Sequence, residues 1–133
     1  MPIELEMTLR ILLSAALGGV IGYQRERAGK QAGLRTLVLV SVGAALFTIV
    51  SIQGFSTVAD PARVAAGIVV GVGFLGAGAI LRREGGIVDG LTTAATIWVV
   101  AGVGLAAGAG MYIISAVASA LILLVLLLPH PIR

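Results

Sequence analysis

The chain contains an uncharged stretch, TLVLVSVGAALFTIVSIQGFSTVA, over residues 36–59. A helix of roughly 20 apolar residues crosses a hydrocarbon core of about 30 Å, so these 24 residues are long enough to span a bilayer. Other uncharged runs cover residues 11–24, 64–81 and, apart from one histidine, 90–132. The last run is long enough for two helices, and Gly108-Ala109-Gly110 is the expected break between them. The sequence therefore predicts several membrane-spanning helices.

The composition supports this prediction. Charged residues make up 11% of the 133 residues and hydrophobic residues 59%, whereas soluble domains carry roughly 25% charged residues. The mean hydropathy is +1.11. The absence of cysteine excludes disulfides and thiolate metal sites. We expect an all-α, polytopic membrane helical bundle that forms one domain over residues 1–133, with no soluble C-terminal domain.

Five spans are expected, at about 5–23, 34–53, 63–81, 91–107 and 110–128. The first span requires the long Arg10 side chain to extend toward the lipid headgroups. Cytoplasmic loops carry an excess of Lys and Arg, so the distribution of these residues predicts the N-terminus outside and the C-terminus in the cytoplasm. The seven basic residues expected on the cytoplasmic side are Arg25, Arg27, Lys30, Arg35, Arg82, Arg83 and Arg133, against Arg10 and Arg63 outside.

Glycines are expected to form helix-packing strips. Small residues four positions apart let two helix backbones approach closely in a membrane. The third span is the densest in glycine, so we expect it to lie at the centre of the bundle. The alternative is that this span unwinds and exposes carbonyl groups to an ion or substrate. The packing residues expected from this pattern are Gly18, Gly22, Gly71, Gly73, Gly76 and Gly78.

The polar groups inside the expected spans are uncharged, since no Asp, Glu, Lys or Arg lies at the centre of an expected span. This pattern disfavours proton-coupled transport. Trp98 is expected to pack in the core with an internal acceptor for its indole N–H. The chain has one histidine, no cysteine and no pair of intramembrane carboxylates, so it offers few of the groups that general acid–base catalysis requires. We expect no enzymatic activity and no cofactor.

Charged groups gather at the expected cytoplasmic face. One interpretation is a basic collar that contacts anionic headgroups. The other is a cavity in which Glu26 and Asp89 bind Mg²⁺ with waters, although the excess of basic residues there suits a phosphate or lipid headgroup better than a cation. On the opposite face, Asp60 is expected to cap the third helix before Pro61, and Arg63 to anchor it at headgroups.

Taken together, residues 10–112 resemble the MgtC/SapB family of bacterial inner-membrane proteins. The resemblance rests on Gly18–Gly22, the Ala-Gly-Leu-Arg-Thr block at 32–36, the glycine-rich block at 71–78 and Gly-Leu-Thr-Thr at 90–93. The motif residues that the resemblance marks as interaction candidates are Arg25, Glu26, Lys30, Arg35, Thr36, Asp60, Arg63, Thr92, Thr93 and Trp98.

The resemblance implies a multi-pass inner-membrane protein that modulates membrane transport or energetics during adaptation to low magnesium, with a link to virulence. The alternative is a small oligomeric channel or transporter for Mg²⁺ or another solute. The expected partners are the lipid bilayer, a second copy in a homodimer or other homo-oligomer, and other inner-membrane proteins. Nucleic acid is not expected, because the basic residues lie directly beside the spans.

Overall fold

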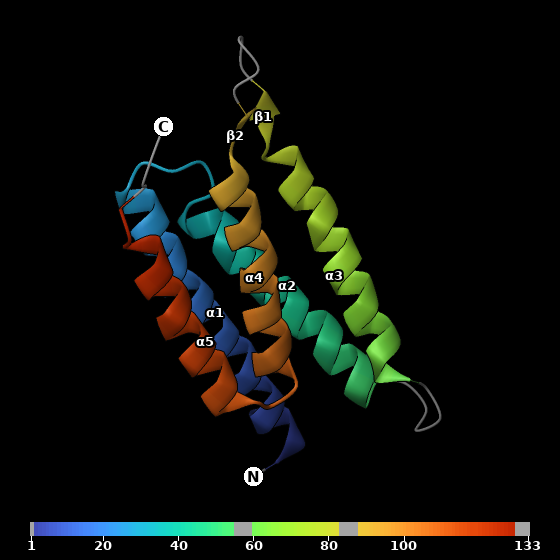
Figure 1. Cartoon of the computed structure of the whole chain (residues 1–133). Helices are drawn as coiled ribbons and strands as arrows, with labels where there is room; N and C mark the ends of the chain where they lie inside the picture. The colour runs from blue at the N-terminus through green and yellow to red at the C-terminus, as the bar shows by residue number, and fades with distance from the viewer. Residues whose placement is uncertain (1, 55–59, 83–87, 130–133) are drawn as a thin grey trace.

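The computed structural model describes residues 2–54, 60–82 and 88–129, and these residues form five helices and a short strand pair (Figure 1). The apolar runs fold as α-helices because a helix satisfies its own backbone groups inside a membrane. The helices are α1 (Ile3–Arg27), α2 (Leu34–Gln53), α3 (Pro61–Gly78), α4 (Leu91–Gly108) and α5 (Tyr112–Leu126). The strands β1 (Leu81–Arg82) and β2 (Val88–Asp89) pair antiparallel.

The prediction of an all-α membrane bundle is confirmed. Four helices, α1 to α4, are long and apolar enough to cross a membrane, and α5 is a shorter apolar helix. The expected boundaries agree closely for α2 and α4, whereas α1 continues to Arg27 and α3 ends at Gly78. The strand pair after α3 was not predicted. Its two-residue strands are too short to show the alternation that predicts a strand.

Two glycine turns set the ends of α1 and α4. Gly29 and Gly110 have positive φ angles of 73° and 85°, which residues with a Cβ rarely adopt. In each turn the next N–H reaches back into the last helical turn, as in Lys30 to Arg25 at 3.0 Å and Met111 to Ala106 at 2.9 Å. These bonds satisfy carbonyl groups that the helix itself leaves free. The break expected at Gly108–Gly110 is therefore present.

The core lies where α1, α2 and α4 meet. One cluster joins Ile21 of α1, Leu37 of α2 and Val100 of α4, all fully buried. A second cluster joins α2, α3 and α4 through Ala44, Ile68 and Ala101. Because lipid tails are as apolar as these side chains, close packing holds the helices together more than the exclusion of water does.

Glycines produce the closest helix contacts, at α1 on α2 and at α4 on α2. A Cβ at Gly18 would lie 2.8 Å from the Leu37 carbonyl oxygen, and one at Gly22 would lie 2.8 Å from the Leu34 Cα. A Cβ at Gly108 would lie 2.7 Å from the Ala45 carbonyl oxygen, and one at Gly104 would overlap the Ser41 carbonyl oxygen. Both pairs are four residues apart, the spacing that permits close backbone contact.

The expectation that the third span is central is wrong. Helix α3 lies at the side of the bundle (Figure 1), and only Ile68 and Gly76 of this helix are buried. A Cβ at Gly71, Gly73 or Gly78 would have no other atom within 4 Å, whereas one at Gly76 would lie 3.2 Å from the Ala94 carbonyl oxygen. A high density of glycine shows that other helices can pack closely against a helix, but it does not show which helices do so in the folded bundle. Helix α4, with nine buried residues, is the central one.

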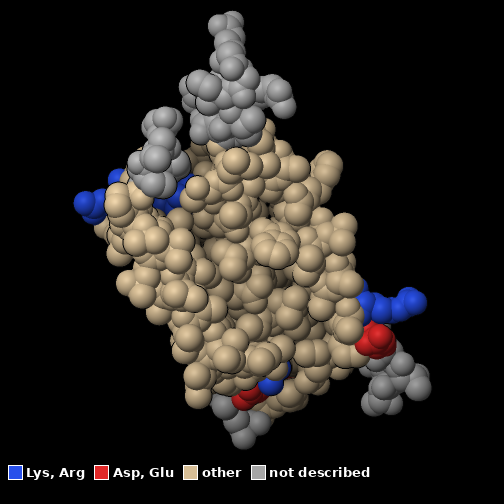
Figure 2. Space-filling view, in the orientation of Figure 1, with Lys and Arg blue, Asp and Glu red and all other residues tan. Residues whose placement is uncertain are grey.

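Charged groups lie toward the two ends of the bundle. On the face shown in Figure 2, the band between the ends carries no Lys, Arg, Asp or Glu. The α1–α2 loop, the β1–β2 pair and the C-terminal end of α5 lie at one end, which we call the loop end. The N-terminus and the α4–α5 turn lie at the other (Figure 1). This arrangement is the one expected for five successive crossings, while the side of the membrane that each end faces stays a prediction.

Candidate functional site

The candidate site is a polar contact between α1 and α4 at the loop end, formed by Arg25, Thr93 and the first turn of α4, residues 91–93. We call it the Arg25–Thr93 site. The guanidinium Nη2 of Arg25 donates a hydrogen bond of 2.6 Å to Thr93 Oγ1. Arg25 is 3% exposed and Thr93 5% exposed. The bond explains why α1 continues past its expected end, since its last turn carries Arg25 into the bundle.

Arg25 is incompletely satisfied. Its Nε is buried and has no hydrogen-bond partner, and the same is true of Oε1 of the preceding Gln24. Among the residues whose side chains the structure describes, the single ion pair within 4.0 Å joins Glu6 and Arg10. A buried polar group without a partner is costly, and each one in a native structure requires an explanation. The guanidinium is therefore a buried charged group whose missing partner has to be explained.

The first turn of α4 adds backbone N–H groups to this site, and the N-cap residue does not pair them. Its N-cap is Gly90, which provides no side chain to accept the free N–H groups. Gly90 has a φ of 93°, and a Cβ there would overlap the Ala79 carbonyl oxygen. The close approach of α3's last turn thus requires glycine at the N-cap. Thr92, on the same turn, is exposed at the end of the bundle.

Glu26 has a structural role, because one of its carboxylate oxygens caps the start of α2. Its Oε1 accepts a hydrogen bond of 3.1 Å from the backbone N–H of Leu34, the first residue of α2. A carboxylate at this position satisfies a free N–H and is favoured by the helix dipole. The side chain of Asp89, the other candidate magnesium ligand, lies outside the described residues. Within the described chain, no three His, Cys, Asp or Glu side chains come together as a metal site.

The remaining motif residues at the loop end lie on the surface. Lys30, Arg35 and Thr36 are exposed.

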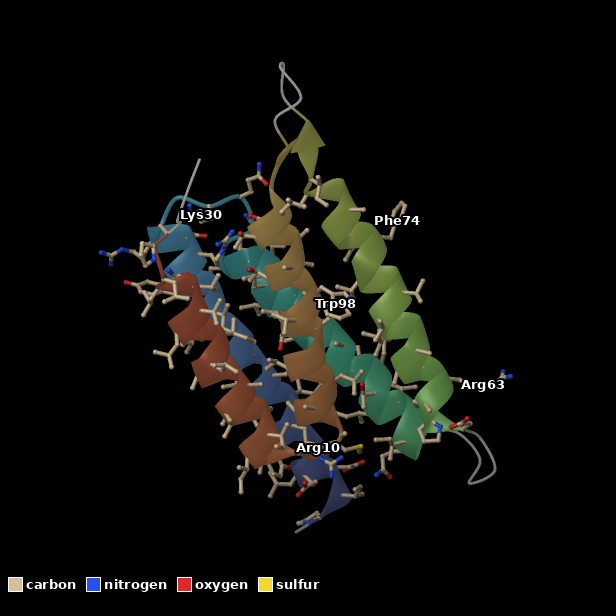
Figure 3. All side chains as sticks on the ribbon, viewed as in Figure 1. Arg10, Lys30, Arg63, Phe74 and Trp98 are labelled. Atoms are coloured by element: carbon tan, nitrogen blue, oxygen red, sulfur yellow. The ribbon has the colours of Figure 1, made fainter. Side chains whose placement is uncertain are left out.

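Trp98 was expected in the core, and this expectation is wrong because its side chain is 51% exposed and projects from α4 (Figure 3). The inner face of α4 is occupied by small residues such as Ala101 and Gly104 that allow close packing, which leaves the bulky indole on the outer face.

At the opposite end, the expected cap of α3 is present. The Asp60 side chain accepts a hydrogen bond of 3.0 Å from the Ala62 N–H, and Pro61 occupies the first helical position. Arg63 is exposed and points away from the bundle (Figure 3).

A second polar cluster, around Arg10, was not predicted from the sequence. Arg10 was expected to extend to headgroups, but it turns inward to the α4–α5 turn (Figure 3). Its Nη1 donates to the Gly108 carbonyl oxygen at 3.1 Å, and its Nε pairs with Glu6 at 3.1 Å. Tyr112 also donates to the Glu6 carboxylate. The spacing of Glu6 and Arg10, four residues apart on one helix, was the available signal.

Comparisons with known proteins agree with the resemblance. The model of the MgtC family matches residues 11–133. The putative magnesium transporter YhiD of Escherichia coli K12 is 50% identical over 132 residues, covering 94% of this chain and 61% of the relative. Protein MgtC of Brucella abortus strain 2308 is 50% identical over 118 residues, and protein SapB of Bacillus subtilis is 42% identical over 117.

These two matches cover 87% and 83% of this chain but 48% and 50% of the relatives. The chain thus spans about half to two thirds of the length of the curated relatives that it matches. No solved structure matches it. On the family match and these identities, the chain belongs to the MgtC family of membrane proteins.

Proposed function

We propose that this chain is a non-enzymatic protein of the bacterial inner membrane that modulates other transport proteins during adaptation to low magnesium. The observation that carries the proposal is the use of the buried hydroxyl groups. They bond to backbone carbonyls within the bundle, as in Ser41 to Ser14 at 2.8 Å and Thr48 to Ala44 at 2.7 Å. The hydrogens of these hydroxyl groups already have acceptors inside the bundle, so the groups need no solute to complete their hydrogen bonds.

The backbone contacts support the same role. At Gly104 and Gly108 the helices α4 and α2 approach so closely that a Cβ does not fit. Passage of a hydrated cation between them would require these contacts to separate. A tightly packed bundle with an apolar outer surface is suited to contacts with other membrane proteins. The partners would be a second copy of the chain and inner-membrane transport proteins.

Transport of Mg²⁺ is the second candidate. It is favoured by the name of one relative, a putative magnesium transporter that is 50% identical to this chain. In that case the path would have to form between copies in an oligomer, where the open glycines of α3, including Gly67 and Gly71, would face a neighbour.

Flux measurements on the purified chain distinguish the two candidates. The protein is reconstituted into vesicles loaded with a magnesium-sensitive dye, with protein-free vesicles as the control. A modulator gives the same Mg²⁺ entry as the control vesicles. A saturable flux that depends on the amount of protein would contradict the modulator role and establish transport.

A second experiment tests the partners and the physiological role. A strain that lacks the gene is complemented with this chain, grown at limiting Mg²⁺, and its membranes are crosslinked and purified. We expect restored growth and crosslinks to a second copy and to a transport protein. Restored growth with no crosslinked membrane protein would contradict the modulator role.

A further inference from the structure

The Arg25–Thr93 site contains a buried positive charge for which the described residues provide no negative partner. Arg25 is 3% exposed, and its neutral contact, Thr93 Oγ1, does not compensate the guanidinium charge within the described part of the chain. The Nε makes no hydrogen bond. Buried charges in proteins are paired, because removal of an isolated ion from water is very unfavourable. A counter-charge is therefore expected at this position.

The adjacent end of α4 requires the same kind of partner. The first N–H groups of an α-helix have no acceptor within the helix and carry a partial positive charge. Gly90 provides no capping side chain, and the contact with Ala79 excludes any residue that would. The guanidinium and the helix N-terminus meet at Thr93, the third residue of α4. Both would normally be stabilised by an anion.

We propose that the Arg25–Thr93 site binds a phosphate group. A guanidinium presents a planar fork of donors that matches phosphate oxygens, and helix N-termini bind phosphate through their N–H groups. Leu91 and Thr92 on the first turn of α4 are exposed, so this turn lies at the surface of the loop end, from which a phosphate would approach. Two exposed basic residues on the other side of the α1–α2 turn, Lys30 and Arg35, attract anions toward that end.

The phosphate could come from a lipid headgroup or from a free phosphate in solution. The bundle end lies where headgroups would surround it, and the chemistry of recognition is the same for both sources. The competing possibility is that Asp89, which precedes Gly90 and whose side chain lies outside the described residues, supplies the charge. This inference is independent of the modulator role, since it concerns only the state of Arg25.

The test uses thermal unfolding of the purified chain, residues 1–133, in detergent. One arm adds inorganic phosphate, against sodium gluconate at equal ionic strength. The other arm adds phosphatidylglycerol to the micelles, against phosphatidylcholine. We expect a saturable rise in the melting temperature with phosphate, with phosphatidylglycerol, or with both. Stabilisation by the lipid alone identifies a headgroup as the source, and stabilisation by inorganic phosphate identifies the free anion.

Variants connect the response to Arg25. Arg25→Gln should abolish the rise, whereas Arg27→Gln, which removes an exposed charge from the same helical turn, should retain it. If Arg25→Gln does not fold, Arg25→Lys keeps the charge without the planar fork and should weaken the apparent affinity about tenfold.

Three results would overturn the proposal. The first is no stabilisation by either anion. The second is an equal response in wild type and in the Arg25 variants, which would assign binding to the exposed basic residues. The third is an anion response that is absent in wild type and present in Asp89→Asn, because Asp89 would then be the counter-charge.

Discussion

Two arginines of α1 turn into the bundle, although both lie close to the ends of a membrane span. Arg10 bonds to the α4–α5 turn and Arg25 to the start of α4. A sequence shows how far an arginine is from the end of an apolar run, but it does not show whether a polar acceptor lies closer than the headgroups. Thr93 and the Gly108 carbonyl are such acceptors, and they come from parts of the chain 68 and 98 residues away.

The cluster at Arg10 yields a prediction about Tyr112. The Tyr112 hydroxyl donates to the Glu6 carboxylate, which also pairs with Arg10. Tyr112→Phe removes that donor and keeps the ring, so we expect the melting temperature to fall by a few degrees. Thermal unfolding in detergent measures the change. Tyr23→Phe, which removes the acceptor of an exposed hydrogen bond from Arg27, is the matched control, and an equal effect in the two variants would show that the bond to Glu6 stabilises no more than an exposed bond does.

The cap that Glu26 provides to α2 yields a second prediction. Glu26→Ala leaves the Leu34 N–H without its acceptor, and loss of a helix cap typically costs about 1 kcal/mol. Glu26→Gln keeps an oxygen at the same position and should cost less. Unfolding by a graded denaturing detergent compares the two free energies. Full stability of Glu26→Ala would show that the Leu34 N–H finds another acceptor, and would leave the carboxylate available for other roles.

At the scale of the helices, the sequence predicted their number and positions well but not their arrangement. The apolar runs are long, and their ends are marked by charges or by glycine turns, so each helix could be located. Which helix is central depends on which glycine faces a partner. Gly71 and Gly104 look alike in the sequence, yet a Cβ at Gly71 would meet no atom within 4 Å and one at Gly104 would overlap the Ser41 carbonyl oxygen.

The contact between α4 and α2 gives a test of this difference. Gly104→Ala forces the two helices apart, and overpacking of this kind costs about 1–3 kcal/mol. Gly102→Ala is the matched control, because a Cβ at Gly102 has open space on the same helix and alanine favours the helix by up to about 1 kcal/mol. The unfolding free energies of the two variants should therefore change in opposite directions. A neutral Gly104→Ala variant would contradict the close contact.

At the scale of the whole molecule, the arrangement of the ends accounts for the charge distribution on which the predicted orientation rests. The α1–α2 loop and the β1–β2 pair lie at the same end as the C-terminal end of α5 (Figure 1). Basic residues of separate segments therefore lie at the same end of the bundle, which is the pattern that predicts the orientation. The candidate site could not be located in this way, because the pairing of Arg25 with Thr93 depends on how α1 and α4 pack, and helix spacing alone does not specify that packing.

The orientation itself is testable because the chain contains no cysteine. A single Lys30→Cys variant places a thiol on the α1–α2 loop, and a single Arg63→Cys variant places one near the start of α3, both at exposed positions. The excess of Lys and Arg at the loop end predicts that this end faces the cytoplasm. A membrane-impermeant maleimide added to intact spheroplasts should then label position 63 and label position 30 only after lysis. Labelling of position 30 in intact spheroplasts would reverse the orientation and place the Arg25–Thr93 site on the outer side, where it could meet only anions outside the cell or in the outer leaflet.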